Sequence, residues 1–180
     1  RPQTTGRNQL ILDLSKPEVC DYIVDAVSAI LEANPISYVK WDMNRNMAEF
    51  PGAGFAHRYM LGLYNVLERI TTRFCDVLFE SCSGGGGRFD AGMLCYMPQT
   101  WTSDDTDAVE RLYIQEGTGL VYPISTMGAH ISAVPNHQVG RTTPIPLRSK
   151  VAMIGRFGLE LDLGKLDRED LDILAKEIAE

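Results

Sequence analysis

The sequence predicts an α/β fold with parallel strands and favours a (β/α) barrel that is incomplete. Short β-prone runs alternate with amphipathic helical stretches, which is typical of βαβ units. Polar residues that include Asp42, Cys82 and Asp104 follow three of these runs, and parallel sheets carry their chemistry at the carboxyl ends of their strands. Only about five strands can be counted, fewer than the roughly eight of a closed barrel. The chain is therefore an incomplete barrel or, as the alternative, an open sheet.

The first half of the chain contains two predicted helix–strand units. A capping box at residues 15–18, with proline in the first turn, begins a helix that the Asn-Pro pair at 34–35 ends. Residues 36–41 are β-branched and aromatic and are predicted to form a strand. Apolar residues at helical spacing over 59–70 predict a second helix, and a strand follows at 76–80.

The second half continues this alternation less regularly. A weak strand is predicted at 97–102, and a helix at 108–116 follows a cluster of aspartates. Further strands are predicted at 120–124 and 158–161. A final helix is predicted from about Asp167, with a stripe of apolar residues along one face.

Composition limits the classes of function. The chain has 180 residues, of which 44% are hydrophobic, enough for a globular domain with a core. Its net charge of −7 argues against nucleic acid as a partner. There is no apolar run of the ~20 residues that cross a bilayer, and the cysteines lack metal-ligand spacing. We therefore expect no membrane partner, no metal and a cytoplasmic location, and the start at Arg1 suggests a piece of a longer protein.

Residues 79–90 (FESCSGGGGRFD) carry the strongest functional signal. Four consecutive glycines after a strand indicate a backbone that turns sharply or lies against a ligand. A phosphate-binding nest is one alternative, but neither glycine motif for phosphate has the required spacing here. Close approach of the backbone to an uncharged ligand such as a sugar ring fits better.

Asp42 is a candidate nucleophile. Lys40 precedes it by two residues, so on a strand both side chains point to the same face. A cation beside a carboxylate favours its ionised form, which a carboxylate nucleophile requires. A plain salt bridge at the end of a strand is the alternative.

Asp104 and Asp105 open a predicted helix, where capping is the alternative interpretation. A carboxyl group beside the apolar ring of Trp101 would have a raised pKa and suit general acid catalysis. An ionised and a protonated carboxyl group that face each other perform glycoside hydrolysis. Trp41 and Trp101 also suit stacking on a sugar, with an ordinary core position as the alternative.

Two later histidines, His130 and His137, lack the elbow motif of a serine–histidine–acid triad. We predict that both lie in loops and form hydrogen bonds, with metal ligation as the alternative.

Several long motifs resemble the α-galactosidases of glycoside hydrolase family 36. They are residues 38–45 (YVKWDMNR), 79–90 (FESCSGGGGRFD), 101–111 (WTSDDTDAVER) and 134–140 (VPNHQVG), with further similarity at 6–9, 57–64 and 158–163. The resemblance spans essentially the whole chain. It implies that residues 1–180 form a partial catalytic domain with about the last five strand–helix units of a (β/α)8 TIM-type barrel. An N-terminal β-sandwich, the first barrel strands and a C-terminal β domain would be absent.

The resemblance also implies roles for individual residues. Asp42 would be the nucleophile that forms a covalent galactosyl-enzyme, and Asp104 the acid/base, with Asp105 as the alternative. The two carboxyl groups would lie roughly 5–5.5 Å apart, as retention of configuration requires. The implied sugar-binding residues are Arg7, Lys40, Trp41, Asn44, Cys82, Gly84, Gly85 and Trp101. No cofactor and no metal is implied.

The implied function is hydrolysis of terminal α-D-galactosyl residues from oligosaccharides of the melibiose and raffinose type. The partner would be the α-galactoside itself, and the full-length protein would be a homo-oligomer. Galactosyl transfer between sugars is one alternative, and a non-catalytic carbohydrate-binding or interaction fragment is another. Because part of the pocket would lie outside the chain and parallel strand edges would be exposed, we expect little or no activity from these 180 residues alone.

Overall fold

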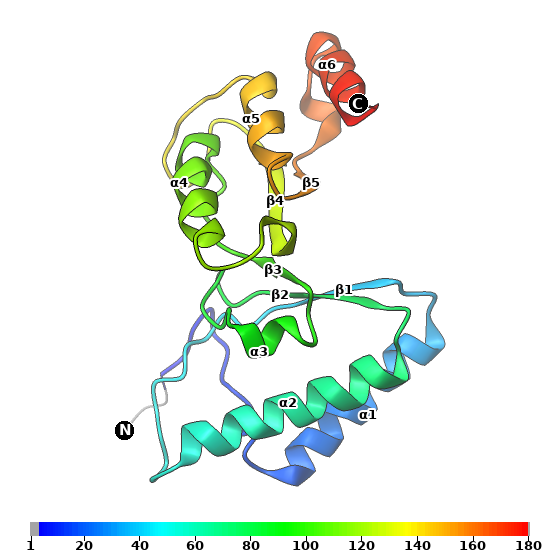
Figure 1. Cartoon of the computed structure of the whole chain (residues 1–180), viewed down its shortest axis with the longest axis vertical. Coiled ribbons are helices and arrows are strands. Elements are labelled where there is room, and N and C mark those ends of the chain that lie inside the picture. The colour runs from blue at the N-terminus through cyan, green and yellow to red at the C-terminus, as the bar shows by residue number, and fades with distance from the viewer. Residues whose placement is uncertain (1–3, 180) are drawn as a thin grey trace. The chain divides into compact units, whose positions relative to one another are not determined.

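A computed structural model describes residues 4–179 of the chain. Within that range, five strands alternate with six α-helices and two short 3-10 turns (Figure 1). The chain divides into two compact units, Arg1–Pro98 and Gln99–Glu180. The strands that pair inside each unit are parallel, which confirms the predicted α/β class. No helix in the described part of the chain is long and apolar enough to cross a membrane.

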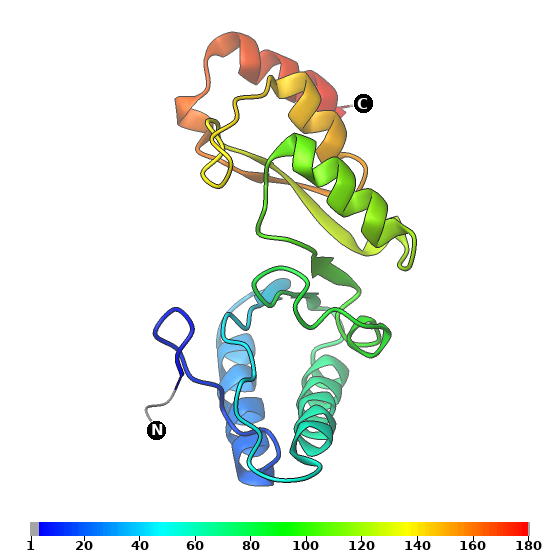
Figure 2. The ribbon, with the colours of Figure 1, turned by 90° about the vertical axis from the view of Figure 1, so that its left-hand side faces the viewer.

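The first unit contains two long helices and two parallel strands. Its elements are α1 (Pro17–Ala33), β1 (Tyr38–Trp41), α2 (Phe55–Arg73), β2 (Leu78–Ser81) and the short α3 (Ala91–Leu94). Helices α1 and α2 pack side by side (Figure 2). Strands β1 and β2 pair in a register that sets Lys40 opposite Glu80.

Strand alternation separates the core of this unit from its polar face. Phe79 of β2 packs into a cluster with Leu67 and Ile70 of α2, and all three side chains are at most 2% exposed. Lys40 and Glu80, which alternate with the core positions, lie on the opposite face of the strands. The helices thus cover one face of β1 and β2 and leave the other face to polar side chains.

The second unit repeats the strand–helix alternation. Its elements are β3 (Gln99–Trp101), α4 (Ala108–Gly119), η1 (Ile124–Thr126), β4 (Met127–Ser132), α5 (Ile145–Ala152), β5 (Arg156–Glu160), η2 (Leu163–Lys165) and α6 (Arg168–Ala179). Strand β4 pairs with both β3 and β5. The core joins Ala129 and Ile131 of β4 to Ile145 of α5 and Leu174 of α6.

Helix α1 begins differently from the prediction. Lys16 is its N-cap and forms no side-chain cap, while the Ser15 hydroxyl donates to Oδ1 of Asp13 over 2.6 Å. The nearby aspartate carboxylate therefore takes the hydroxyl that a capping box would have used, and the predicted box at 15–18 is wrong. Pro17 does stand in the first turn, and Asn34 is the C-cap, as predicted.

The strand predicted at 120–124 is also wrong. Leu120 and Val121 are 84% and 73% exposed and belong to the turn after α4. The strand comes later, as β4, and contains His130, which the sequence had placed in a loop. Gly128 and Ala129 make β4 poor in β-branched residues, so its composition does not indicate a strand.

Candidate active site

The four-glycine segment forms a tight loop directly after β2. Gly84 and Gly85 have φ values of 55° and 88°, a left-handed conformation that glycine adopts without steric cost. The loop closes through hydrogen bonds from the Ser83 N–H to the Gly85 carbonyl (2.8 Å) and from the Gly87 N–H to the Ser83 carbonyl (3.3 Å). A Cβ atom at Gly87 would lie 2.6 Å from the Ser83 oxygen, whereas one at Gly84 would meet nothing within 4 Å. The loop is therefore closed on one side and open at Gly84.

This loop anchors the end of β1. The Cys82 N–H donates to the Trp41 carbonyl over 3.0 Å, and the Met43 N–H donates to the Cys82 carbonyl over 3.1 Å. The Ser83 hydroxyl donates to the Met43 carbonyl over 2.8 Å. Asp42 therefore lies between two residues whose backbones are both held by the segment after β2.

The carboxylate of Asp42 accepts hydrogen bonds from several donors. Partial burial alone would raise the pKa of Asp42, but bonds from the Cys82 thiol, the Asn44 amide and the Met43 and Gly84 backbones outweigh it and hold the pKa below its usual value. Burial, followed by the bond to Asp42, raises the pKa of Cys82 to about 11. The thiol thus stays protonated and donates to a carboxylate that stays ionised.

Lys40 has a carboxylate partner that the sequence did not predict. Its Nζ lies 3.3 Å from Oε1 of Glu80, whose side chain is only 1% exposed. The Tyr38 hydroxyl donates to the other oxygen of Glu80. The groups that lower the pKa of Asp42 most are hydrogen-bond donors, and a contribution from the Lys40 charge stays a prediction.

The predicted sugar-binding residue Arg7 lies in a tight turn. Its φ of 49° is left-handed, which is uncommon for a residue other than glycine, and paired backbone hydrogen bonds between Gly6 and Gln9 close the turn. A Cβ atom at Gly6 would lie 2.9 Å from the Asn44 carbonyl oxygen. The turn that carries Arg7 is thus packed against the loop that follows Asp42.

A cavity of about 170 Å³ borders the end of β1. Its lining includes Trp41, Asp42, Asn44 and Arg88. Trp41 packs against the hydrophobic core of its unit, which is the alternative that the sequence left open for a tryptophan. Its assignment to sugar binding stays a prediction.

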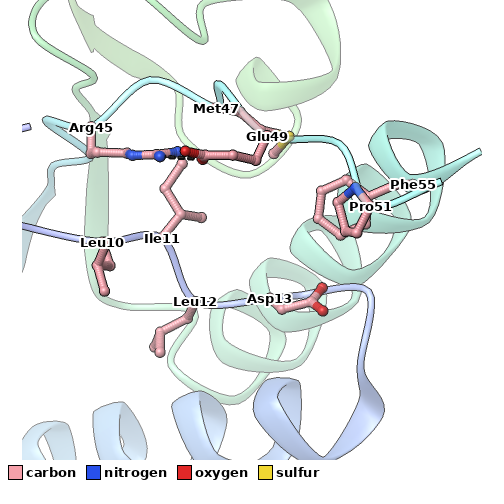
Figure 3. A pocket seen from close by; sticks show the side chains of 9 residues that line it. All are labelled: Leu10, Ile11, Leu12, Asp13, Arg45, Met47, Glu49, Pro51 and Phe55. Carbon is pink, nitrogen blue, oxygen red and sulfur yellow. Dashed lines mark hydrogen bonds and ion pairs between the residues drawn. The ribbon is translucent and has the colours of Figure 1, made fainter. Parts of the chain in front are cut away.

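A larger cavity of about 270 Å³ lies beside the loop that follows β1. Its lining, drawn in Figure 3, contains none of the predicted site residues. The guanidinium of Arg45 meets the carboxylate of Glu49 there (Figure 3). We take the smaller cavity as part of the candidate site because it contains Asp42.

Asp104 belongs to the second unit, where the indole of Trp101 holds it. The Trp101 Nε1–H donates to Oδ1 of Asp104 over 3.1 Å. The indole itself is 3% exposed, stacks on His130 with 4.6 Å between ring centroids, and has the Arg111 guanidinium 4.8 Å from its centroid. These contacts fix the orientation of the N–H group that binds Asp104.

The neighbouring aspartates serve the start of α4. Oδ1 of Asp105 accepts the Asp107 N–H over 3.1 Å. Asp107 is the N-cap of α4 and accepts the Val109 and Glu110 N–H groups, each over 3.1 Å. Capping was the alternative interpretation for this aspartate run. It describes Asp107, whereas Asp105 supports the cap residue through its N–H.

Sequence reasoning missed two side chains near the predicted catalytic residues. His130 stacks on Trp101, and its Nδ1 lies 3.5 Å from Oε2 of Glu160. Arg88 lines the Asp42 cavity. Arg88 directly follows the four glycines, so the motif could have indicated it. The position of His130 beside Trp101 could have been predicted only from the register of β3, β4 and β5.

The described residues include two predicted catalytic carboxyl groups, one in each unit, with different hydrogen-bond partners. Asp42 is a carboxylate kept ionised by hydrogen bonds, and Asp104 is a second carboxyl group with an indole donor. Within residues 4–179, no three His, Cys, Asp or Glu side chains gather as a metal site. An ionised carboxylate and a proton-donating carboxyl group are what hydrolysis of a glycoside uses.

Known proteins resemble this chain along its whole length. A family model described as melibiase matches residues 1–180. Alpha-galactosidase AgaA of Geobacillus stearothermophilus is 59% identical over 187 residues, which cover 99% of this chain and 26% of the relative. Probable alpha-galactosidase G of Emericella nidulans is 59% identical over 174 residues, which cover 96% of this chain and 24% of the relative.

Solved structures agree with these matches. The crystal structure of the Geobacillus enzyme, a GH36 α-galactosidase, superposes with a TM-score of 0.95 over 99% of this chain and 26% of that one. A variant of that enzyme in complex with raffinose gives a TM-score of 0.96 over the same shares. This likeness confirms the predicted (β/α)8-barrel type. The chain spans about a quarter of the length of the curated relatives that it matches.

Proposed function

The chain belongs to the glycoside hydrolase family 36 α-galactosidases, the melibiase family, and from this we propose that it forms part of the catalytic barrel of a retaining α-galactosidase. The enzyme would remove terminal α-D-galactosyl residues from oligosaccharides of the melibiose and raffinose type by double displacement. The barrel would be completed by strands outside these 180 residues, and we call that whole protein the complete enzyme.

The observation that carries the proposal is the environment of Asp42. Its carboxylate accepts bonds from Cys82, Asn44 and two backbone N–H groups, which keep it ionised. In the first step it attacks the anomeric carbon while the bond to the leaving oxygen breaks, which gives a β-linked galactosyl ester. The open side of the glycine loop at Gly84 leaves room for a sugar beside this carboxylate.

We assign the acid/base role to Asp104. It would protonate the departing oxygen in the first step and take a proton from water in the second. Asp105 is the weaker candidate because its carboxylate accepts the Asp107 N–H at the start of α4. The residues proposed to contact the galactose are Arg7, Lys40, Trp41, Asn44, Cys82, Gly84, Gly85 and Trp101.

Replacement of each acid tests the proposal in the complete enzyme. Asp42→Gly should lower kcat by roughly 10⁴-fold or more, and azide should restore turnover of an aryl α-galactoside. Azide would attack the substrate from the face that Asp42 occupied, so the product would be the β-galactosyl azide. Asp104→Gly should also respond to azide but give the α-galactosyl azide, because there azide opens the β-linked ester.

The anomeric configuration of the two products decides the roles. Full activity of the Asp42→Gly variant, or an α-azide from it, would remove Asp42 as the nucleophile. Incubation of the unaltered enzyme with raffinose separates hydrolysis, which releases free galactose, from transfer, which builds longer oligosaccharides. The 180-residue chain alone is expected to release little or no galactose in the same assay.

A further inference from the structure

We propose, on the basis of the nucleophile role assigned to Asp42, that Arg88 is a positioning residue which holds the backbone before Asp42 and sets a partly buried positive charge beside it. Arg88 follows the four glycines directly. Its side chain returns from the glycine loop to the end of β1.

The first argument is the hydrogen bond that Arg88 makes. Its Nη2 donates to the carbonyl oxygen of Trp41 over 2.7 Å. The same oxygen accepts the Cys82 N–H over 3.0 Å, so both of its lone pairs have a donor. Because this carbonyl belongs to the peptide bond that leads into Asp42, Arg88 restricts the rotation that would turn the carboxylate away.

The second argument is the location of the charge. Arg88 is partly buried and lines the cavity of about 170 Å³ that also contains Asp42. Its Nε is buried and has no hydrogen-bond partner among residues 4–179. A guanidinium in such a place costs free energy unless an opposite charge compensates it. Burial lowers the pKa of Arg88, while Tyr59, Asp42 and Cys82 favour its charged form.

The charge of Arg88 would matter most when Asp42 is ionised. That is the state of the free enzyme before attack and again after water has released galactose. In between, Asp42 is part of a neutral ester, and the positive charge has no carboxylate to stabilise. The effect should therefore appear in the acid limb of kcat/KM against pH, which reports the ionisation of the free enzyme.

Substitutions at Arg88 in the complete enzyme separate the charge from the hydrogen bond. Arg88→Gln keeps a donor for the Trp41 carbonyl but removes the charge, and Arg88→Met removes both. Arg88→Lys keeps the charge. With an aryl α-galactoside, both neutral variants should move the acid limb upward by about one pH unit, and Arg88→Lys should move it by less than half as much. Loss of the Trp41 bond should lower kcat further in Arg88→Met than in Arg88→Gln.

Arg45→Gln is the matched control. Arg45 lines the same cavity, is more fully buried than Arg88 and donates to a backbone carbonyl, that of Thr4, but its charge is already paired with Glu49 (Figure 3). Its removal should leave the acid limb in place.

An unmoved acid limb in a folded neutral variant at position 88 would overturn the proposal. We expect Arg88→Met to fold, because an apolar side chain often replaces a buried charge without loss of stability. Failure of both neutral variants to fold would make Arg88 a structural residue and also reject the proposal. The azide products of Asp42→Gly are measured in parallel. If Asp42→Gly gives the β-galactosyl azide but the acid limb of the Arg88 variants does not move, only the role of Arg88 is rejected. If azide does not restore the activity of Asp42→Gly, the proposed function itself is rejected.

Discussion

The indole N–H of Trp101 donates a hydrogen bond to Oδ1 of Asp104 across 3.1 Å. The adjacent Asp105 points its carboxylate to the Asp107 N–H instead. Two neighbouring aspartates that look alike in the sequence therefore differ in structure, and only Asp104 combines partial burial with a fixed aromatic donor. This difference leads to opposite predictions for the two positions.

Asp104→Asn should lower kcat of the complete enzyme on raffinose by about 10²–10⁴-fold, the range for loss of a general acid. The loss in kcat/KM, which reports the first step alone, should be much smaller with an aryl α-galactoside whose leaving group needs no protonation. Steady-state kinetics on the two substrates measure this difference. Equal losses on both would contradict the acid role.

Asp105→Asn is the matched comparison. Removal of its charge weakens the bond to the Asp107 N–H, which should cost about 1 kcal/mol of stability. The Tm of the complete enzyme should fall by less than the ~2–4 °C expected of a domain of this chain's size, while kcat on raffinose stays within a factor of about 3 of the unaltered enzyme. A thousandfold loss of kcat in Asp105→Asn would exchange the two assignments.

Cys82 is predicted to set the lower pH limit of activity together with the other donors. As the proposed nucleophile, Asp42 must be ionised to attack, and its pKa is held below the usual value in part by the Cys82 thiol. Removal of that donor raises the pKa of Asp42, so kcat/KM should begin to fall at a higher pH as the solution is acidified. Cys82→Ala should show this upward shift, and Cys82→Ser, which keeps a donor, a smaller one. An acid limb that does not move in Cys82→Ala would contradict the prediction.

The thiol of Cys82 should also resist alkylation. Its pKa of about 11 and its burial leave almost no thiolate at pH 8, and the thiolate is the form that reacts. Cys75 and Cys95 are exposed and unbridged. Iodoacetamide at pH 8, followed by peptide mass spectrometry, should label those two cysteines and spare Cys82.

Much of the first unit could be predicted because its pattern reflects burial. The apolar spacing over residues 59–70 matches the buried face of α2, and the glycine run after β2 does form a special turn. The partner of Lys40 could not be predicted. Strand alternation put Lys40 and Asp42 on one face, but pairing with β2 brought the buried Glu80 to the lysine.

The strands of the second unit were harder to predict because some of its apolar residues are exposed. Leu120 and Val121 suggested a strand but are exposed. The strand that does form, β4, contains Gly128 and Ala129. Their small size permits close packing with neighbouring residues, but neither residue is typical of strands. The stack of His130 on Trp101 depends on neighbouring strands and has no local sequence signal.

The glycine loop allows a comparison of two alanine substitutions. At Gly87 a Cβ atom would lie 2.6 Å from the Ser83 backbone oxygen, so Gly87→Ala should distort the loop and reduce soluble yield. At Gly84 a Cβ atom meets open space, although φ is 55°. Gly84→Ala should therefore fold with a cost of about 1–2 kcal/mol and mainly raise KM, because its methyl group projects into the proposed sugar site. Thermal melts and KM for raffinose distinguish the two effects.

Gly158 is predicted to control Trp101 through His130. A Cβ atom at Gly158 would lie 2.5 Å from Cδ2 of His130, so Gly158→Ala must displace the imidazole. That displacement loosens the stack on Trp101, whose indole N–H holds Asp104. We expect kcat on raffinose to fall by about tenfold, which corresponds to about 1.4 kcal/mol, together with a change in tryptophan fluorescence.

Gly155→Ala provides the control for that experiment. Its Cβ atom would lie 2.6 Å from the carbonyl oxygen of Met127, which is in β4 like His130, and the nearest atoms around it do not include His130. It should lower the Tm but leave the ratio of activities on raffinose and on an aryl α-galactoside unchanged. Gly158→Ala should reduce kcat/KM on raffinose more than that on the aryl substrate, because in the proposed mechanism only the raffinose leaving group needs protonation by Asp104. An unchanged ratio in Gly158→Ala would show that the position of the indole does not govern the acid.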